Sequence, residues 1–496
     1  EKADTRVKPE YDEISINSGL KSFLQRSQAC TFHIHILFSE TRVLTCLLFL
    51  KFKCLSETFF QTGIFHNVRI LLFLERVPMS SSSQIGLTAL TALVISSMIG
   101  SGIFSLPQNM AAVAGSQALL IGWLITGIGI VFLGLSFACL SKLRPDLDGG
   151  IYTYARDGFG DLMGFFSAWG YWLCTTVGIV GYLVVAFEAI GSFTDSPGHL
   201  LFGQGNTFYA FLGESAVAWL IYWLVASGIK QAAGVNLVAT CVKIFPLVLF
   251  IGLAAYFFQA DIFLADWSGV GIGGTQEADN SIMAQVKNTM LITLWVFTGI
   301  EGAAVLSKHA RRRSDIGKAT VIGVLITLAL YVAITVLAQG VLPRADIAAM
   351  ANPSMAGVRA HMVGHWGKVL ISCCLIVSVL SSYLSWTLYA TESPHLGAKN
   401  GAFPASFIKL NKNEVPHGSL LFTTLTVQLC LFLVWQTGNS YSALLMISTS
   451  MILIPYFLIG AYLVKLSFTQ NLAMKYKIIG LLATLYALPW LVYSLV

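Results

Sequence analysis

Long apolar runs recur along this chain from Ile85 to its end, and each is long enough to cross a lipid bilayer. Only 11% of the residues are charged and 56% are hydrophobic, whereas a soluble domain carries about 25% charged residues. Because a membrane helix needs about 20 consecutive apolar residues, the pattern predicts an all-α polytopic membrane protein. We expect eleven spanning segments, at about 85–107, 117–140, 161–192, 211–229, 234–258, 285–306, 319–342, 366–392, 418–436, 441–465 and 477–495.

The basic residues are unevenly divided between the loops that connect these segments. If the first segment begins in the cytoplasm, the inward loops hold fifteen Lys and Arg residues and the outward loops hold four. The densest group is the inward cluster between Lys308 and Lys318. Because positive residues favour the cytoplasmic side, this asymmetry supports both the number of segments and a cytoplasmic N-terminus for the membrane domain.

Residues 1–78 do not share the composition of the remainder. Their apolar patches, such as Val43–Leu50, are too short to span a bilayer. Met79 is followed by a polar run, Ser80–Gln84, which is a natural start before a first membrane helix. We therefore expect residues 1–78 to be an N-terminal extension that is disordered or absent from the native product, and residues 79–496 to form the transmembrane domain.

The first spanning segment is interrupted by Gly100, Ser101 and Gly102. Each Gly costs roughly 1 kcal/mol relative to Ala inside a helix. A bilayer tolerates unwound backbone only where protein or a watery cavity satisfies its polar groups. The stretch therefore indicates either a deliberately broken helix or small residues that let another helix pack closely.

The sixth segment carries a second interruption, with Gly299, Glu301 and Gly302 in the middle of an apolar run. A pair of Gly-interrupted helices is the best sequence indication of a transporter's binding site at the bilayer midplane. The two segments are five apart, as in a fold of five-plus-five inverted repeats with discontinuous helices 1 and 6. Half-helix N-termini suit a carboxylate and unpaired carbonyls suit an ammonium, so we expect an α-amino acid as ligand.

Two ionisable residues lie deep in the spanning segments. Glu301 either titrates or braces the break during transport, or it only bonds the backbone, and we favour the functional interpretation. Lys243 lies about nine residues into the fifth segment. It either snorkels to the surface or is a buried ammonium where a coupling Na⁺ would otherwise sit. Ser378, Ser381 and Ser382 either face Lys243 or are small packing residues.

Other candidate groups carry weaker signals. Trp295 and Trp386 lie in mid-segment and suit stacking on a cationic side chain. We expect Glu188 at the outer rim of the third segment, and we do not expect His361 and His365 to bind a metal. The nine Cys residues form no CxxC pair, and the sequence shows no HExxH, P-loop or GxSxG motif. We expect no cofactor, no metal and no enzymatic activity.

Four motifs together resemble the amino acid–polyamine–organocation (APC) superfamily. They are Ile99–Pro107 (IGSGIFSLP), Pro145–Tyr154 (PDLDGGIYTY), Trp295–Glu301 (WVFTGIE) and Ser385–Thr387 (SWT). The resemblance runs from about Ser83 to the end and is strongest to the bacterial basic amino acid antiporters, in particular the arginine/ornithine branch. It implies a bacterial inner-membrane protein and one possible assembly as a homodimer.

The resemblance also implies roles for individual residues. Ser101 and Gly102 would hold the substrate carboxylate, beside Gly100 in the same substrate site, and carbonyls near Met98, Trp295 and Thr298 would take its α-ammonium. Trp386 would cover the distal cationic group, and Ser448 would lie near the substrate's side chain. Trp295 and Tyr171 would act as gates or gate partners, and Glu301 would be the acid linked to the pH response. From its depth in the fifth segment, and not from the resemblance, we count Lys243 with these gating and coupling residues.

This chain departs from the family pattern at two points. Ile179 stands where relatives often place an Asn that binds a guanidinium, so the substrate is arginine or another cation such as lysine. The family usually has twelve helices, and the eleven predicted here indicate a truncated chain or a disrupted gene end.

We expect an antiporter that exchanges a cationic amino acid, arginine or lysine, for ornithine or a related amine by alternating access. One alternative is a proton-coupled amino acid symporter. A second alternative is a truncated permease that does not transport, or an amino acid sensor.

Overall fold

The computed structural model describes residues 84–196, 199–269, 281–350, 353–438 and 441–495. Within these ranges nearly all regular structure is helical, and the only β pairings are isolated bridges. The predicted extension 1–78, and with it the boundary at Met79, lies outside the described residues.

Each predicted spanning segment corresponds to helical structure at the expected place. The first corresponds to α3 (Leu87–Met98) with α4 (Gly102–Val113), and the sixth to α11 (Ile282–Val296) with α12 (Gly302–Val305). The others are α5 (Ser116–Leu143), α7 (Asp161–Thr194), α8 (Phe208–Ala226), α9 (Ile229–Tyr256), α13 (Arg313–Val341), α16 (His365–Lys399), α17 (His417–Thr437), α18 (Tyr441–Thr469) and α19 (Met474–Leu495). Short helices lie between them: α6 (Ile151–Phe159), α10 (Ala260–Ala265), η3 (Ser307–His309), α14 (Arg344–Ala348), α15 (Ser354–Val363) and η4 (Ala405–Ile408).

A helix that crosses a membrane alone needs about 18 or more residues and a strongly apolar stretch. Eight described helices meet this requirement individually, and a ninth span results if α3 and α4 are joined across their 41° bend. The sixth segment is divided into two short helices, α11 and α12, and the eleventh is α19. A polytopic helical membrane protein is therefore confirmed, and nine of the eleven predicted segments meet this requirement.

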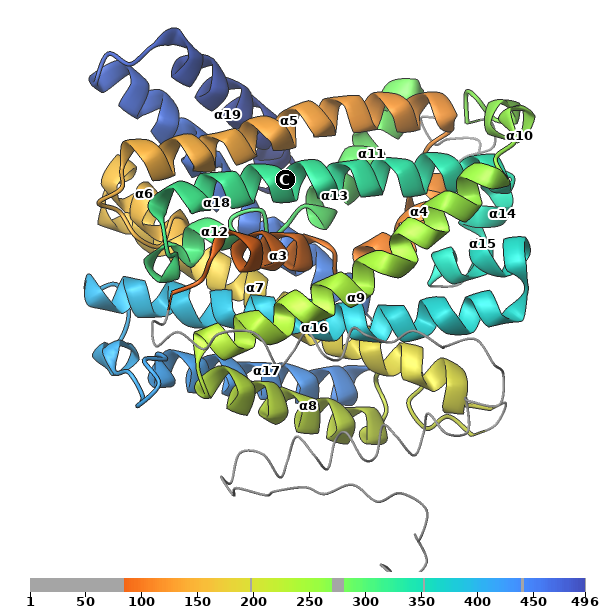
Figure 1. The fold of residues 1–496 in the computed structure, drawn as a ribbon, viewed down its shortest axis with the longest axis horizontal. Helices are drawn as coiled ribbons and strands as arrows, with labels where there is room; N and C mark the ends of the chain where they lie inside the picture. The colour runs from red at the N-terminus through yellow and green to blue at the C-terminus, as the bar shows by residue number, and fades with distance from the viewer. Residues whose placement is uncertain (1–83, 197–198, 270–280, 351–352, 439–440, 496) are drawn as a thin grey trace, which may run out of the picture. The chain divides into compact units, whose positions relative to one another are not determined.

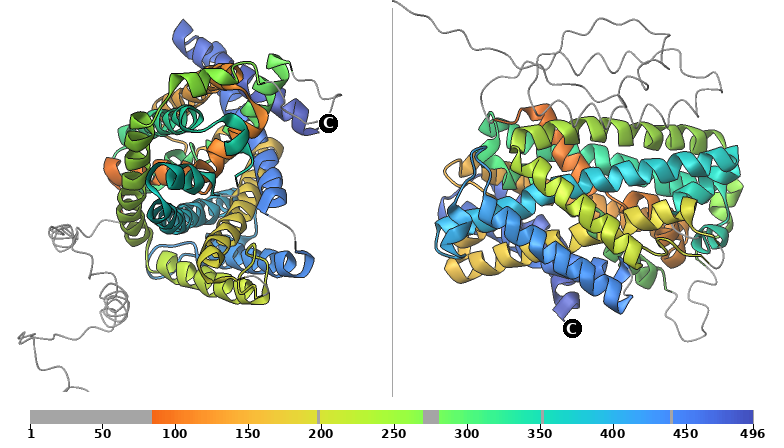
Figure 2. Two further views of the ribbon diagram at one scale, coloured as in Figure 1. Left: turned by 90° about the vertical axis from the view of Figure 1, so that its right-hand side faces the viewer. Right: turned by 90° about the horizontal axis from the view of Figure 1, so that it is seen from below.

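The two broken segments cross each other inside the bundle. The first half of one packs on the second half of the other: α3 lies against α12, and α4 against α11. Figure 1 shows α3 between α13 and α16, and both helices contact it. In the view along the bundle (Figure 2, left) the orange α3–α4 segment is enclosed by other helices. An antiparallel crossing of this kind is the arrangement expected of inverted repeats.

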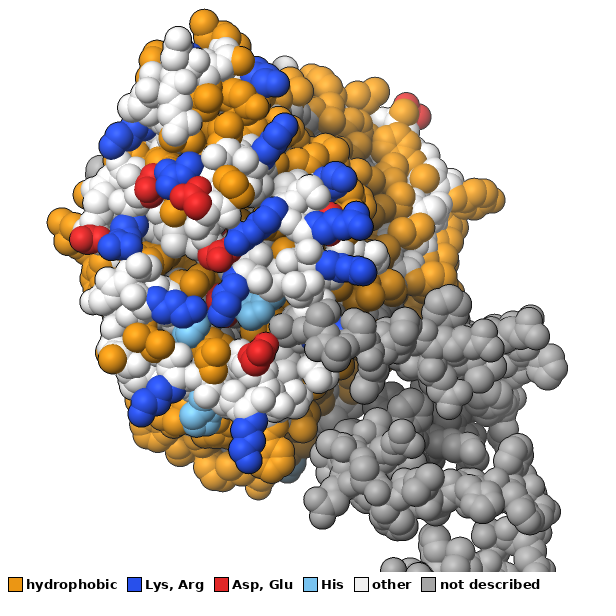
Figure 3. Space-filling model, turned by 60° about the vertical axis from the view of Figure 1, so that its left-hand side comes forward, with side chains coloured by type: hydrophobic (Ala, Val, Ile, Leu, Met, Phe, Trp, Pro, Cys, Tyr) orange, Lys and Arg blue, Asp and Glu red, His pale blue; other side chains and the backbone are white. Residues whose placement is uncertain are grey.

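One end of the bundle carries most of the basic side chains. Figure 3 shows Lys and Arg gathered on this face with Asp and Glu between them. We call it the basic end; it comprises the ends of helices and the loops near Arg144, Arg156, Lys308, Arg313 and Lys399. Basic residues from several of the loops predicted to face inward therefore lie together at one end of the structure.

Ion pairs fasten the loop after α5 at the basic end. Arg144 lies 2.7 Å from Asp146 and also pairs with Asp157 of α6. The Tyr462 hydroxyl donates to Asp157 at 2.5 Å, which ties α6 to α18. The hydrogen bonds from Arg144 hold the pKa of both carboxyls below the ordinary value. These bonds anchor part of the Pro145–Tyr154 motif.

The helix pair α5 and α19 depends on a small residue at its contact. A Cβ atom at Gly129 would lie 2.1 Å from the Tyr486 ring, so α5 accepts α19 only because Gly129 has no side chain. Small residues of this kind allow close helix packing in membranes.

Gly129→Ala is expected to destabilise the folded protein by about 1–3 kcal/mol, the usual cost of overpacking. Gly252→Ala is the matched control, because no atom lies within 4 Å of a Cβ there. The melting temperature in detergent measures both, and equal values for the two variants would contradict the packing of α19 on α5.

Asp157→Asn is expected to lower the melting temperature at pH 7. The folded-state pKa of Asp157 is lowered, so its stabilisation is complete above the unfolded-state pKa of about 4. It is lost as the pH falls through the lower folded-state pKa. The difference between variant and unchanged protein is therefore constant above about pH 4 and shrinks below it, whereas a difference that grew on acidification would contradict the pairing.

Candidate functional site

The predicted break in the first segment is present, and its ends are buried. The last helical bond of α3 runs from Ile99 N to Ile95 O at 2.8 Å, and α4 restarts at Gly102. Ser101 lies between them with 1% of its surface exposed. The first N–H groups of a helix have no partner within that helix, so the N-terminus of α4 presents donors beside the C-terminal carbonyls of α3.

Both interpretations of the small residues hold. A Cβ at Gly100 would lie 2.5 Å from the Tyr182 ring, and one at Gly102 would lie 2.8 Å from the Trp295 ring. Gly100 and Gly102 therefore allow close packing in addition to interrupting the helix. Two aromatic rings, from α7 and α11, cover the break.

The second break touches the first. Gly299 has φ +111°, a conformation that side chains rarely adopt. A Cβ there would also lie 2.7 Å from Ser97, whose hydroxyl donates to Gly299 O at 2.9 Å. The second break thus requires Gly at this position for two reasons, and Ser97 joins the two interrupted helices.

A tyrosine that the sequence analysis missed connects the breaks from outside. The hydroxyl of Tyr331, on α13, lies 2.6 Å from Met98 O and 2.9 Å from Val296 O. These are the last helical carbonyls of α3 and α11. The only available signal was a polar hydroxyl in the middle of an otherwise apolar run.

Lys243 is completely buried, and its ammonium bonds the end of α3. Its Nζ donates to Ile99 O at 2.8 Å, to Ser96 Oγ at 2.9 Å and to Ser96 O at 3.1 Å. It also lies 3.3 Å from Ser382 Oγ on α16. The snorkelling interpretation is therefore wrong, because the side chain is directed at the break and not at the surface.

The serines of α16 also contact the break. Ser378 Oγ lies 3.2 Å from both Ile99 O and Gly100 O, and Ser382 Oγ lies 2.7 Å from Ser96 O. Ser381 instead bonds Asn236 Oδ1 at 3.0 Å. Of the three serines, Ser382 therefore bonds Lys243 as predicted, whereas Ser378 and Ser381 bond the break and Asn236 and not Lys243.

Asn236, on α9, is a second residue that the sequence analysis missed. It is fully buried, and its Oδ1 accepts hydrogen bonds from Ser96, Ser381 and Ser385. It joins α3, α9 and α16 about two helical turns from Lys243. An Asn within an apolar run is the sequence signal that would have found it.

Glu301 lies at the start of α12 with 1% of its surface exposed. Tyr456, on α18, donates its hydroxyl to Glu301 Oε2 at 2.7 Å, and Gly299 N lies 3.3 Å from the same oxygen. Tyr171 of α7 is fully buried, and its hydroxyl has no hydrogen-bond partner among the described residues. The bonds of Glu301 therefore connect the second break to α18.

Trp386, on α16, lies between the first break and α7. Trp386 Nε1 donates to Ser97 O at 3.0 Å, and its ring meets Tyr182 edge-on with centroids 5.3 Å apart. A Cβ at Gly178 would lie 2.3 Å from the same ring. Ile179, the next residue of α7, is fully buried.

The remaining predicted site residues lie around this centre. Thr298 is 3% exposed, and its Oγ1 has no hydrogen-bond partner in the described part of the chain. Ser448 Oγ, on α18, donates to Cys174 O at 2.8 Å and so lies against α7. His361 belongs to α15, and the described residues contain no group of three His, Cys, Asp or Glu that suits a metal ion.

The carbonyls expected to hold an ammonium already have partners. Met98 O accepts from Gly100 N at 2.9 Å in addition to Tyr331. Trp295 O accepts from Thr298 N at 3.0 Å and from Phe297 N. A carbonyl has two lone pairs, so in this conformation both carbonyls are used by the protein itself.

Comparison with known proteins identifies the family of this chain. A family model described as "Amino acid permease" matches residues 85–496. A protein of Escherichia coli (strain K12), named "Putative arginine/ornithine antiporter", is 51% identical over 83% of this chain and 87% of its own length. The "Arginine/ornithine antiporter" of Pseudomonas aeruginosa is 46% identical (84% and 86% covered), and the "Arginine/agmatine antiporter" of Chlamydia pneumoniae is 43% identical (84% and 86%). The chain belongs to the amino acid permease family.

Proposed function

We propose that this protein is an antiporter that exchanges a cationic amino acid, arginine or lysine, for ornithine or a related amine. The observation that carries the proposal is the pair of touching helix breaks, lined by buried polar groups, in a chain about half identical to proteins named for arginine/ornithine exchange. The protein is on this proposal a transporter and not an enzyme. It needs no cofactor, because the exposed main chain supplies the binding groups.

The substrate carboxylate binds at the N-terminus of α4. The N–H groups near Ser101 and Gly102 and the positive end of the α4 dipole favour an anion there. Gly100 and Gly102 let the ligand approach the backbone once the rings of Tyr182 and Trp295 move aside. Ring movement at these two positions is the local gate.

The α-ammonium and the distal cation occupy the other side of the breaks. The ammonium replaces protein donors at the carbonyls of Met98 and Trp295, and the hydroxyl of Thr298 is available to it. The face of Trp386 covers the distal cation. Because Ile179 is apolar, a guanidinium gains no amide partner from that position, and lysine is accepted alongside arginine.

Lys243 supplies the positive charge that a coupling Na⁺ would supply in another transporter. Its ammonium already donates hydrogen bonds to the carbonyls at the end of α3. Because no Na⁺ is then needed at these carbonyls, the substrate gradients alone drive exchange. In alternating access, α3–α4 and α11–α12 rock together against the other helices. The hydrogen bond from Ser97 to Gly299 O joins the two segments directly and supports their movement as one body.

We further propose that the basic end faces the cytoplasm of a bacterial inner membrane, because positive loops remain on that side. The end that carries α10, α14 and α15 is then the outer end. A homodimer is the assembly that the family resemblance implies.

Trp386→Ala is expected to abolish saturable uptake of labelled arginine or lysine into proteoliposomes preloaded with ornithine. The distal cation loses its covering ring, while the backbone groups at the breaks remain. Trp223→Ala is the matched control, since that side chain is 70% exposed on α8. Unchanged uptake by Trp386→Ala would remove this residue from the site.

Lys243→Ala is expected to lower the melting temperature, because each buried acceptor left without its donor costs about 1–3 kcal/mol. If Lys243 replaces a sodium ion, Na⁺ but not choline should restore part of this loss, and neither should affect the unchanged protein. Cys241→Ala, at an exposed position of the same helix, serves as the control. A variant insensitive to Na⁺ would contradict the replacement.

The same vesicles distinguish the alternative functions. Uptake that requires a pH gradient but no internal substrate would indicate a proton-coupled symporter that uses Lys243 or Glu301. Specific binding without uptake would indicate a sensor or an inactive permease. The proposed antiporter requires internal substrate.

A further inference from the structure

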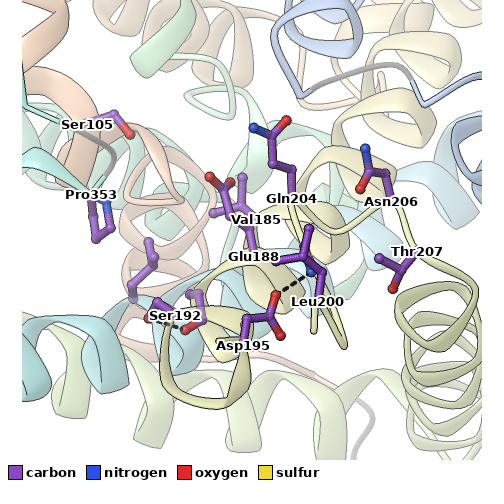
Figure 4. A pocket seen from close by; sticks show the side chains of 14 residues that line it. Ser105, Val185, Glu188, Ser192, Asp195, Leu200, Gln204, Asn206, Thr207 and Pro353 are labelled. Atoms are coloured by element: carbon purple, nitrogen blue, oxygen red, sulfur yellow. Dashed lines mark hydrogen bonds between the residues drawn. The ribbon is translucent and has the colours of Figure 1, made fainter. Parts of the chain in front are cut away.

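A cavity of about 560 Å³ opens near the outer end of the bundle, and no residue of either helix break lines it. Figure 4 shows side chains from α7, from the loop that follows it, and from α4 around this cavity. Its volume is within the 300–1,000 Å³ typical of small-molecule sites. It is therefore large enough for a single amino acid.

The cavity is close to the proposed substrate site. Ser105 lines it from α4 and is four residues, or about 6 Å of helix rise, beyond Ser101. Val185 lines it from α7 and is three residues beyond Tyr182, whose ring covers Gly100. The residue that covers the first break, Tyr182, is thus about one helical turn from a residue that lines the cavity.

Both charged residues that line the cavity are acidic. They are Glu188 and Asp195, and no Lys, Arg or His of the described chain lines it. The carboxylate of Asp195 accepts hydrogen bonds from the backbone N–H groups of Leu201, Phe202 and Gly203, so it already stabilises the loop after α7. Glu188 is half-buried and has no hydrogen bond or ion pair with any described residue.

A cavity of similar volume at the basic end shows the opposite arrangement. Its four lining Asp residues all pair with Arg side chains: Asp146 and Asp157 with Arg144, Asp161 with Arg156, and Asp148 with Arg313. Of these two cavities, only the outer one is therefore lined by a partly buried carboxylate that pairs with no cation of the described residues. Such a charge is unfavourable unless a cation pairs with it.

We propose that Glu188 anchors an outer subsite that receives the cationic side chain of an incoming amino acid or amine before it reaches the breaks. The inference rests on the proposed exchange function and deepens it. The amide groups of Gln204 and Asn206 line the same cavity and supply donors for the carboxylate of an amino acid. An acid-lined cleft raises the local concentration of cations and their rate of entry. Glu188 therefore lowers the KM for cationic substrates that enter from the outer side, which we call the outer KM.

The test measures KM for external arginine in ornithine-loaded bacterial cells that lack other arginine transporters. Glu188→Gln keeps the size and shape of the side chain and removes its negative charge. This variant should raise the outer KM about tenfold, with little change in the maximal rate of uptake. Its KM should also depend less on ionic strength than that of the unchanged protein. Glu188→Asp retains the charge and should stay close to the unchanged protein.

Asp261→Asn is the matched control. Asp261 is an exposed acid at the outer end, on α10, and does not line the cavity. Its removal should leave KM unchanged.

Three results would overturn the subsite: an unchanged KM for Glu188→Gln, equal losses in the Gln and Asp variants, or a lower maximal rate at constant KM. If the unchanged protein exchanged no cationic substrate, the proposed function would fail and the subsite with it. Normal exchange together with a normal Glu188→Gln variant would remove the subsite alone.

Discussion

The structure depends on one constraint, which is that backbone polar groups freed inside a bilayer must find partners. Two helices are interrupted here, and each released carbonyl that the structure describes in detail is bonded by a neighbouring element. Lys243, Ser378 and Ser382 bond the end of α3, Tyr331 bonds both α3 and α11, and Ser97 bonds Gly299. The breaks are therefore stable without a ligand, and a ligand acts by exchanging one set of donors for another.

The same constraint explains why polar side chains gather on α9 and α16. Both helices pack on α3, and Asn236, Ser381 and Ser385 form a buried network with Ser96. Each member of this network has its partner on another helix. A polar core of this kind specifies how the helices fit together, because a shift of one helix leaves several buried groups unpaired. Apolar contact alone does not give that specificity in lipid.

The spanning helices and both breaks were predictable because their signals are local. A run of about 20 apolar residues or a Gly-Ser-Gly triplet can be read directly from the sequence. The partners of the breaks were not predictable in the same way. Tyr331, Asn236 and Tyr456 are distant from the breaks in sequence, and their roles come from how α9, α13 and α18 pack. For Lys243 the local pattern allowed two directions, and only the position of α3 decides between them. The split of the sixth segment leaves α11 with 15 residues and α12 with 4, so neither is long enough to cross a membrane alone.

The shared hydroxyl of Tyr331 has a mechanical consequence. One O–H group has one hydrogen and lies within bonding distance of two carbonyls that belong to different interrupted helices. Whichever carbonyl takes the hydrogen, the other is left more available to an incoming ammonium. A substrate ammonium bound to one of these carbonyls would then strengthen the hydrogen bond from Tyr331 to the other carbonyl. The position of this single hydrogen therefore couples substrate binding at one interrupted helix to the hydrogen bonding of the other.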